Sequence, residues 1–261
     1  MDLELHGKKA LVTGSTAGIG MAIATALARE GADVVVNGRT EARVAEAMAK
    51  IRVGAKASVS GVAAYAGTQA GADLLAAQHP QIDVLVNSLG IFEPKPFGEI
   101  SDADWLRFFE VNVLSGVRLS RAYLPQMLQR NWGRIVFISS ESGFQIPAEM
   151  IHYGVTKSAQ VSLARGLAET TAGTGVTVNS VLPGPTRSEG VEAFVEKLSG
   201  GKDFGEFERE FFAKVRPTSL LQRFETVEEI AAVVAFVCSP LASAINGAAV
   251  RAEGGVLKSA F

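Results

Sequence analysis

Thr13-Gly14-Ser15-Thr16-Ala17-Gly18-Ile19-Gly20 is a glycine-rich turn that joins two apolar segments of the chain. Before it, Ala10 to Thr13 has the composition of a short buried strand; after it, Ile19 to Arg29 has apolar side chains at helical spacing. Glycine permits tight backbone geometry, and the first turn of a helix offers N–H groups that lack acceptors. Such a unit predicts a pyrophosphate-binding turn. Its candidate residues are Gly14, Ser15, Thr16, Gly18, Ile19 and Gly20.

The same alternation of strand and helix continues along the chain. Strand candidates lie at 33–37, 58–64, 82–87, 134–138, 176–181 and 248–250, and helix candidates at 41–51, 69–78, 102–130, 153–171 and 228–238. Apolar strands that alternate with helices favour a doubly wound parallel sheet covered by helices on both faces. We therefore expect one Rossmann-like α/β domain over residues 1–261, with ligands bound beyond the carboxyl ends of the strands.

One segment, at about 186–224, interrupts this rhythm. It is charged and rich in phenylalanine, and it is long for a connection within a compact domain. Segments of this kind often cover a site, so we expect a substrate lid here.

Composition excludes several classes of partner. The chain has 261 residues, 48% of them hydrophobic and 20% charged, with a net charge of −2 and no basic block, which argues against nucleic acid. There is no apolar run long enough for a membrane span and no signal-peptide pattern. Three histidines and the single cysteine, Cys238, have no metal-ligand spacing. We expect a soluble cytoplasmic protein without a metal site.

The end of the second strand indicates which nucleotide is bound. Many nicotinamide sites place an acid there to hold the ribose 2′-hydroxyl. This chain has Asn37-Gly38-Arg39-Thr40 instead, and a guanidinium suits a phosphate. Arg39 therefore predicts a 2′-phosphate clamp and NADP, with NAD possible. The alternative is a solvated arginine at a loop.

Tyr153 and Lys157 are four residues apart in a predicted helix, and this spacing places them on one face. The pair alone is weak evidence. The motifs that accompany the pair are more specific: Asn87-Ser88-Leu89-Gly90 follows a strand, Ser139-Ser140 precedes the tyrosine, and Pro183-Gly184 follows the next strand.

With the turn at 13–20 and Asn112, these motifs make the chain resemble the short-chain dehydrogenase/reductases, among them 3-oxoacyl carrier-protein reductases and carbonyl reductases. The resemblance covers essentially the whole chain. It implies that Tyr153 is the acid/base and Lys157 its partner, which also binds the nicotinamide ribose. It further implies that Ser140, thirteen residues before the tyrosine, holds the substrate oxygen, and that Asn112 supports a water relay from a helix.

The resemblance also implies further cofactor contacts at Asn87, Gly90, Pro183 and Gly184. A hydroxyl just beyond holds the carboxamide in this family, and both Thr186 and Ser188 qualify. Two positions depart from the family pattern. Leu89 is bulkier than the usual alanine, and Tyr65 stands where an aspartate is common, so it either stacks on adenine or packs away.

The implied reaction is hydride transfer between NADPH and a ketone or secondary alcohol, that is, a carbonyl reductase. A free tyrosine has a pKa of about 10, and a nearby ammonium together with the positive cofactor ring would favour the phenolate. The alternatives are a catalytically silent nucleotide-binding sensor or scaffold and, less in keeping with the chain's length, an epimerase or dehydratase. We expect a homo-oligomer, tetramer or dimer. The substrate is expected near Ile91, Phe92, Glu141, Phe144 and Met150.

Overall fold

A seven-stranded parallel sheet forms the centre of the protein in the computed structural model, which describes residues 2–191 and 203–260. The strand order is β3-β2-β1-β4-β5-β6-β9, and each neighbouring pair is parallel. The strands are β1 (Lys9–Val12), β2 (Asp33–Gly38), β3 (Val59–Ala63), β4 (Val84–Asn87), β5 (Gly133–Ile138), β6 (Val176–Pro183) and β9 (Ala249–Ala252). This arrangement confirms the predicted fold class.

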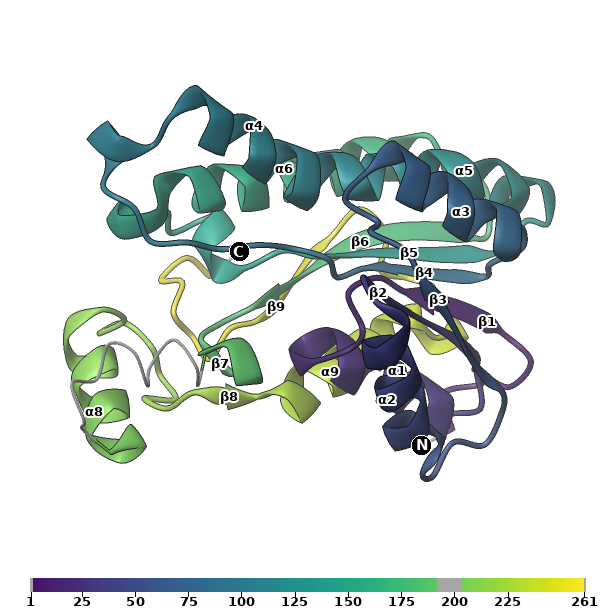
Figure 1. Ribbon diagram of the computed structural model, residues 1–261, viewed down its shortest axis with the longest axis horizontal. Coiled ribbons are helices and arrows are strands. Elements are labelled where there is room, and N and C mark those ends of the chain that lie inside the picture. Colours follow the sequence, from purple (N-terminus) through teal and green to yellow (C-terminus); the bar gives the residue numbers. More distant parts are fainter. Residues whose placement is uncertain (1, 192–202, 261) are drawn as a thin grey trace.

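Helices cover both faces of the sheet (Figure 1). On one face lie α1 (Gly18–Arg29), α2 (Glu41–Arg52) and α9 (Val227–Cys238). On the other lie α3 (Gln69–Gln78), α4 (Asp102–Phe109), α5 (Ser115–Gln129) and α6 (Ile151–Glu169). Alternate strand residues supply the two cores: Val12 packs toward α1, whereas its neighbour Leu11 packs toward α5. Burying a leucine of this kind contributes roughly 1.5–3 kcal/mol.

The strand order reverses between β1 and β4. From β1 the chain builds outward to β2 and β3, then crosses back to β4 and continues to β5 and β6. Connections that leave in opposite directions open a crevice at the carboxyl ends of these two strands. The glycine-rich turn and residues 88–92 both follow these strand ends, so the topology directs them to the same place.

The segment predicted as one helix at 102–130 consists of three parts. Between α4 and α5 lies a π-helical turn, η2 (Glu110–Leu114), which contains Asn112. Pro125 lies inside α5. The interruption therefore follows the eight residues of α4 and includes a residue predicted to be functional, as is common for π turns.

The segment at 186–224 is only partly described, because residues 192–202 of the expected lid lie outside the described residues. It begins with β7 (Thr186–Arg187), which pairs in parallel with β8 (Glu225–Thr226). Between them, α8 (Phe204–Lys214) carries phenylalanines whose rings pack on Phe224; the Phe211 and Phe224 centroids are 5.0 Å apart. None of the helices in the described ranges is long and apolar enough to span a membrane.

Candidate active site

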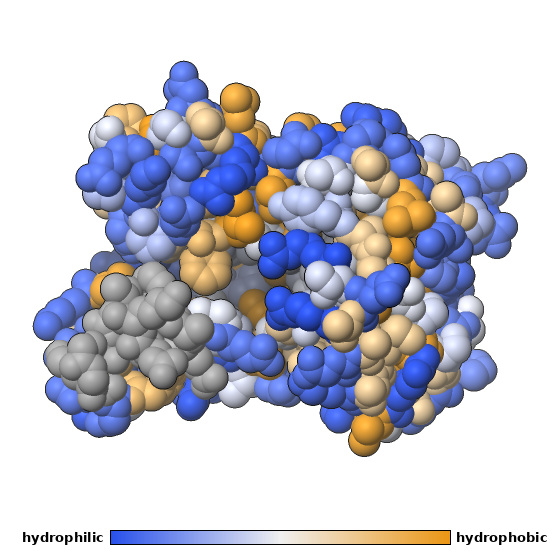
Figure 2. All heavy atoms as spheres, in the orientation of Figure 1, coloured by the Kyte–Doolittle hydropathy of each residue, from blue (hydrophilic) through white to orange (hydrophobic). Residues whose placement is uncertain are grey.

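A cleft of about 350 Å³ lies at the carboxyl ends of the central strands. It is lined by the turn after β1, by residues 88 and 90–92 after β4, by residues 138–142 at the end of β5, and by residues 183–186 and 188 after β6. Tyr153 and Lys157 reach it from α6, and Phe207 and Phe211 from α8. Figure 2 shows the surface hollowed between the lobe that carries α8 and the helices above it.

The turn after β1 has the backbone shape that a diphosphate requires. Gly14 has a φ of +62°, and a Cβ on Gly20 would lie 2.4 Å from the Gly14 carbonyl oxygen, so both positions exclude a side chain. The residue before α1 is Ala17, whose side chain cannot cap the helix, and the first turn has no acid. The N–H groups of the first turn of α1 therefore face the cleft without a capping side chain, which fits an anionic group.

Ser15 has a different role from the one predicted. It is fully buried; its hydroxyl donates to the Val12 carbonyl at 2.7 Å and accepts from Asn37 N, while its own N–H donates to the Asn37 carbonyl. Its donors are committed within the protein and it does not line the cleft. Ser15 therefore ties the turn to β2 and is not placed to contact a cofactor.

Thr16 and Arg39 do not line the cleft but lie at the end of β2, Thr16 against Gly38 and Arg39 next to it in the chain. A Cβ on Gly38 would lie 2.3 Å from Thr16 Cγ2, so only glycine allows the turn to approach this strand. Arg39 follows directly and is exposed. Among residues 2–191 and 203–260 it has no carboxylate partner, so its guanidinium is available to an outside anion.

The structure brings Ser140, Tyr153 and Lys157 together in the cleft. Ser140 Oγ accepts from Ser142 N at 3.1 Å and lies 3.4 Å from Glu141 Oε2. Ser139, the alternative serine, donates its hydroxyl to the Lys157 carbonyl at 2.8 Å and is thereby occupied. Of the serine pair, Ser140 is the one whose side chain interacts with the Tyr153 hydroxyl.

The protonation of Tyr153 differs from the expectation. Burial raises the pKa of its hydroxyl above the ordinary value, the Ser140 hydrogen bond lowers it, and the Glu141 carboxylate raises it again. Lys157 lies 5.5 Å from the centre of the phenol ring, and its Nζ donates to the Ile138 carbonyl at 2.9 Å. Burial lowers the pKa of this ammonium to about 7. The protein's own groups therefore do not make the phenol acidic in the way we predicted, because the ammonium is directed elsewhere.

Asn112 does not lie in the cleft but behind it. Its side chain accepts from Ile91 N at 2.8 Å and donates to the Ile91 carbonyl and to Thr156 Oγ1. Its main-chain carbonyl accepts from Gln160 Nε2 at 2.6 Å, and Gln160 Oε1 accepts from Lys157 Nζ at 3.2 Å. A buried amide thus links the Asn112 carbonyl to Lys157. Sequence reasoning missed Gln160, although its position one turn after Lys157 was a signal.

The remaining predicted cofactor residues surround the inner wall. A Cβ on Gly184 would lie 2.8 Å from the Glu253 Cα atom, so this backbone approaches its neighbour closely, whereas a Cβ on Gly90 would be in ordinary contact with Lys157 Nζ at 3.5 Å. Pro183 ends β6 and lines the cleft. Asn87 does not line it; this side chain is buried, and neither amide atom has a hydrogen-bond partner in the described chain.

Thr186 and Ser188 both line the cleft. Thr186 Oγ1 donates to the Gly184 carbonyl at 2.9 Å, and Ser188 Oγ accepts from Val191 N at 3.3 Å. Ser188 lies beside Gly18 of the phosphate turn. Both hydroxyls remain candidates for a carboxamide contact.

The outer part of the cleft has apolar walls and one ion pair. Its apolar residues are Ile91, Phe92, Met150, Phe207, Phe211 and Phe224. Glu141 and Arg216 also line it, with Arg216 Nε 2.8 Å from Glu141 Oε1. Arg216 was not predicted, because no sequence feature distinguishes this residue from the other charged residues of the segment at 186–224.

Two aromatic residues lie outside the cleft. Phe144, expected near the substrate, does not line the cleft and is 55% exposed. The ring of Tyr65 lies over Gly67, where a Cβ would be 2.7 Å from its Cζ atom, and the side chain is 37% exposed.

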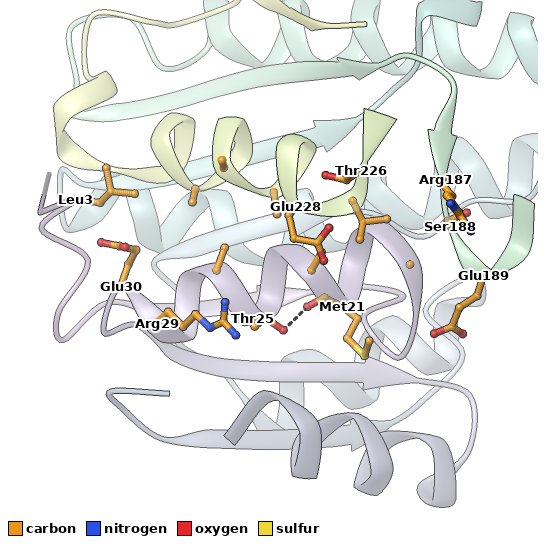
Figure 3. A pocket seen from close by; sticks show the side chains of 17 residues that line it. Leu3, Met21, Thr25, Arg29, Glu30, Arg187, Ser188, Glu189, Thr226 and Glu228 are labelled. Carbon is orange, nitrogen blue, oxygen red and sulfur yellow. Dashed lines mark hydrogen bonds between the residues drawn. The ribbon is translucent and has the colours of Figure 1, made fainter. Parts of the chain in front are cut away.

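A second, larger groove of about 770 Å³ lies between α1 and α9 (Figure 3). Small side chains of the two helices form its floor, and Arg29, Glu30 and Glu228 stand along it. The Thr25 hydroxyl, which also faces it, is bonded to the Met21 carbonyl. Neither Tyr153 nor Lys157 lines this groove. Despite its size, we therefore place the active site in the cleft.

A family model described as short chain dehydrogenase matches residues 8–199, and the chain belongs to this family. Its class is that of oxidoreductases acting on CH–OH or carbonyl groups with a nicotinamide cofactor. The chain is 49% identical over 264 residues to the oxidoreductase YvaG of Bacillus subtilis (strain 168), with all of both chains covered. It is 34% identical to the 3-oxoacyl-[acyl-carrier-protein] reductase FabG of Aquifex aeolicus (strain VF5), covering 98% of this chain and 100% of that protein.

Among solved structures, L-sorbose reductase from Gluconobacter frateurii, complexed with NADPH and L-sorbose, matches with a TM-score of 0.93 and 30% identity. The match covers 99% of this chain and 100% of that one. The similarity therefore includes the cleft and the segment around α8 as well as the sheet.

Proposed function

We propose that this chain is an NADPH-dependent carbonyl reductase, which reduces a ketone to a secondary alcohol with Tyr153 as the acid/base. The observation that supports it best is the convergence of Ser140, Tyr153 and Lys157 in the same cleft as the uncapped N-terminus of α1. One end of the cleft suits a diphosphate and the other a reacting oxygen.

When bound, the cofactor supplies the hydride. Ser140 donates a hydrogen bond to the substrate oxygen as negative charge develops there. Tyr153 gives its proton to that oxygen, so that the carbonyl gains one hydride on carbon and one proton on oxygen. The raised pKa of Tyr153 suits it to hold a proton until the reduction step. In this proposal, Lys157 binds the nicotinamide ribose.

NADP is favoured over NAD by Arg39, whose exposed guanidinium has no carboxylate partner among the described residues. L-Sorbose reductase, which resembles this chain over its whole length, binds NADPH. Both observations support a 2′-phosphate clamp at the end of β2.

We also infer that residues 1–261 form one domain that associates with copies of itself. Leu106 is 71% exposed on α4, and Phe109 and Leu114 are more than one-third exposed on the same continuous helical segment. Exposed apolar faces are typical of interaction surfaces. The described part of the segment at 186–224 supports its role as a substrate lid, because α8 supplies Phe207 and Phe211 to the cleft wall.

A panel of ketones and secondary alcohols, followed by the absorbance of NADPH and NADH in parallel, tests the proposal. We expect reduction of some ketones with NADPH as the better coenzyme. Tight NADP binding without turnover of any member would favour the alternative, a silent nucleotide-binding scaffold.

A further inference from the structure

A buried ion pair stands next to the reacting groups in a wall that is otherwise apolar. The side chains of Glu141 and Arg216 are only 4% and 8% exposed, and both line the cleft. Glu141 follows Ser140 directly, and its Oε2 lies 3.4 Å from Ser140 Oγ. The carboxylate therefore lies next to the serine that is proposed to hold the substrate oxygen.

The pair has hydrogen-bonding capacity that the protein leaves unused. Arg216 Nε donates to Glu141 and its Nη1 to the Val215 carbonyl, and Glu149 Oε1 lies 3.9 Å from Nη1. Its Nη2 has no acceptor in the described part of the chain. Glu141 Oε2 has only the long contact with Ser140. The burial of an ion pair is costly, and apolar residues of similar size often replace such a pair without loss of stability. A ligand group that bonds to both side chains would remove part of this cost.

We propose that Glu141 and Arg216 bind a hydroxyl group on the carbon next to the substrate carbonyl, so that the substrates are neutral α-hydroxyketones and the products are vicinal diols. This inference rests on the proposed reductase function. A hydroxyl donates to the carboxylate and accepts from the guanidinium at once. An anionic group would gain from Arg216 but be repelled by Glu141 and by Glu149, whose Oε1 lies 3.9 Å from Arg216 Nη1. The carbonyl and hydroxyl oxygens of an α-hydroxyketone are roughly one hydrogen bond apart, which matches the spacing of Ser140 and Glu141.

The test compares 3-hydroxybutan-2-one with butan-2-one, which lacks only the hydroxyl. We expect kcat/KM with NADPH to favour the hydroxyketone by roughly 10- to 100-fold, because the deoxy compound leaves the pair unsatisfied. In E141Q/R216M, which removes both charges at similar volume, the ratio should fall toward 1. The control E149Q changes a half-exposed carboxylate 3.9 Å from Arg216 and should keep the wild-type ratio.

The same two ketones, titrated calorimetrically into the protein with oxidised NADP, give a second measurement that needs no turnover. The dissociation constants should show the same preference in the wild type and its loss in E141Q/R216M. A ratio near 1 in the wild type, or a preference unchanged in the double variant, would overturn the inference and leave the pair as a tie between α8 and the loop after β5. Absence of turnover with a retained binding preference would instead count against the reductase function alone.

Discussion

At the scale of single residues, the Nζ atom of Lys157 is held between the Ile138 carbonyl and the amide of Gln160. The other end of that amide donates to the Asn112 carbonyl. Gln160 is 1% exposed, so the bridge is shielded from solvent. Gln160 is therefore a positioning residue, which fixes where the ammonium points without touching the substrate.

We predict that Gln160→Leu lowers kcat about 10-fold, because the loss of one hydrogen bond to a charged group costs roughly 1.5–3 kcal/mol and lets Lys157 reorient. The pH profile of kcat should shift, since the neighbour of a titrating ammonium changes, and Gln160→Glu should shift it in the opposite direction by favouring the charged lysine. The exposed Gln129→Ala serves as control. A fall in kcat with an unchanged pH profile would reduce Gln160 to a packing role.

We propose that Arg39 sets the coenzyme preference. Arg39→Asp replaces a cation beside the predicted 2′-phosphate by a carboxylate that repels it and can accept from a ribose hydroxyl. We expect the NADP/NAD ratio of kcat/KM to fall by roughly 10- to 100-fold, with Arg121→Asp, an exposed change on α5, leaving the ratio unchanged. Equal discrimination in Arg39→Asp and wild type would show that this arginine is merely solvated.

For single residues, the sequence predicted which side chains line the cleft better than it predicted their hydrogen-bond partners. The spacing of Tyr153 and Lys157 placed both in the cleft, but it did not show that Lys157 points to Ile138. Ser15 stands in the right motif, yet its hydroxyl bonds within the turn. Motif spacing fixes where a residue sits on its element, whereas partners such as Arg216, 75 positions from Glu141, depend on tertiary packing.

At the scale of elements, the boundaries that were predicted well carry local signals. Helix α3 spans the predicted residues 69–78, and Thr68 caps it by accepting from Gly71 N. Helix α9 begins at Val227, one residue before its predicted start, after a capping box formed by Thr226 and Glu229. The π turn around Asn112 was not foreseeable, because a change from four-residue to five-residue hydrogen bonding leaves no mark in side-chain periodicity.

Strand β8 holds the loop after β6 through Glu225, whose Oε2 accepts from Gly184 N at 3.0 Å. Burial raises the pKa of this carboxyl to about 7, the Gly184 bond lowers it, and Glu229 and Glu253 raise it. Between pH 4.5 and 7 the folded protein therefore binds a proton that the unfolded chain has released. The free energy of unfolding of the wild type consequently falls as the pH rises through this window. Above pH 7 the destabilisation by the buried charge has its full value.

Glu225→Gln keeps an acceptor for Gly184 and removes the charge. We predict that its free energy of unfolding exceeds that of the wild type by about 1–3 kcal/mol at pH 8.5 and that this difference shrinks toward zero near pH 4.5. Urea unfolding at several pH values measures it, with the exposed Glu228→Gln as control. A difference that is independent of pH would contradict the assignment.

At the scale of the whole molecule, sheet order is what assembles the site. Residues 14, 90, 140 and 184 are far apart in sequence, yet each follows a strand, and the parallel order of β1, β4, β5 and β6 brings these ends to one edge. The alternation of apolar strands with helices was sufficient to predict this. It did not predict the contribution of α8, because the segment that carries it has no such periodicity.

The proposed acid/base role of Tyr153, at this edge of the sheet, requires a bound cofactor. Within the protein alone, burial keeps Tyr153 protonated, and Lys157 is directed away from its hydroxyl. The oxidised nicotinamide ring carries the positive charge that would favour the phenolate at this end of the cleft.

The most direct test is an ultraviolet difference titration of the wild type against Tyr153→Phe, with and without oxidised NADP. Our account predicts that the phenolate of Tyr153 forms at about pH 6 to 9 when NADP is bound, near the pH at which a general acid/base works best, and only above pH 10 without it. Identical titrations of the two proteins across this range, with NADP bound, would contradict the assignment of Tyr153 as the acid/base.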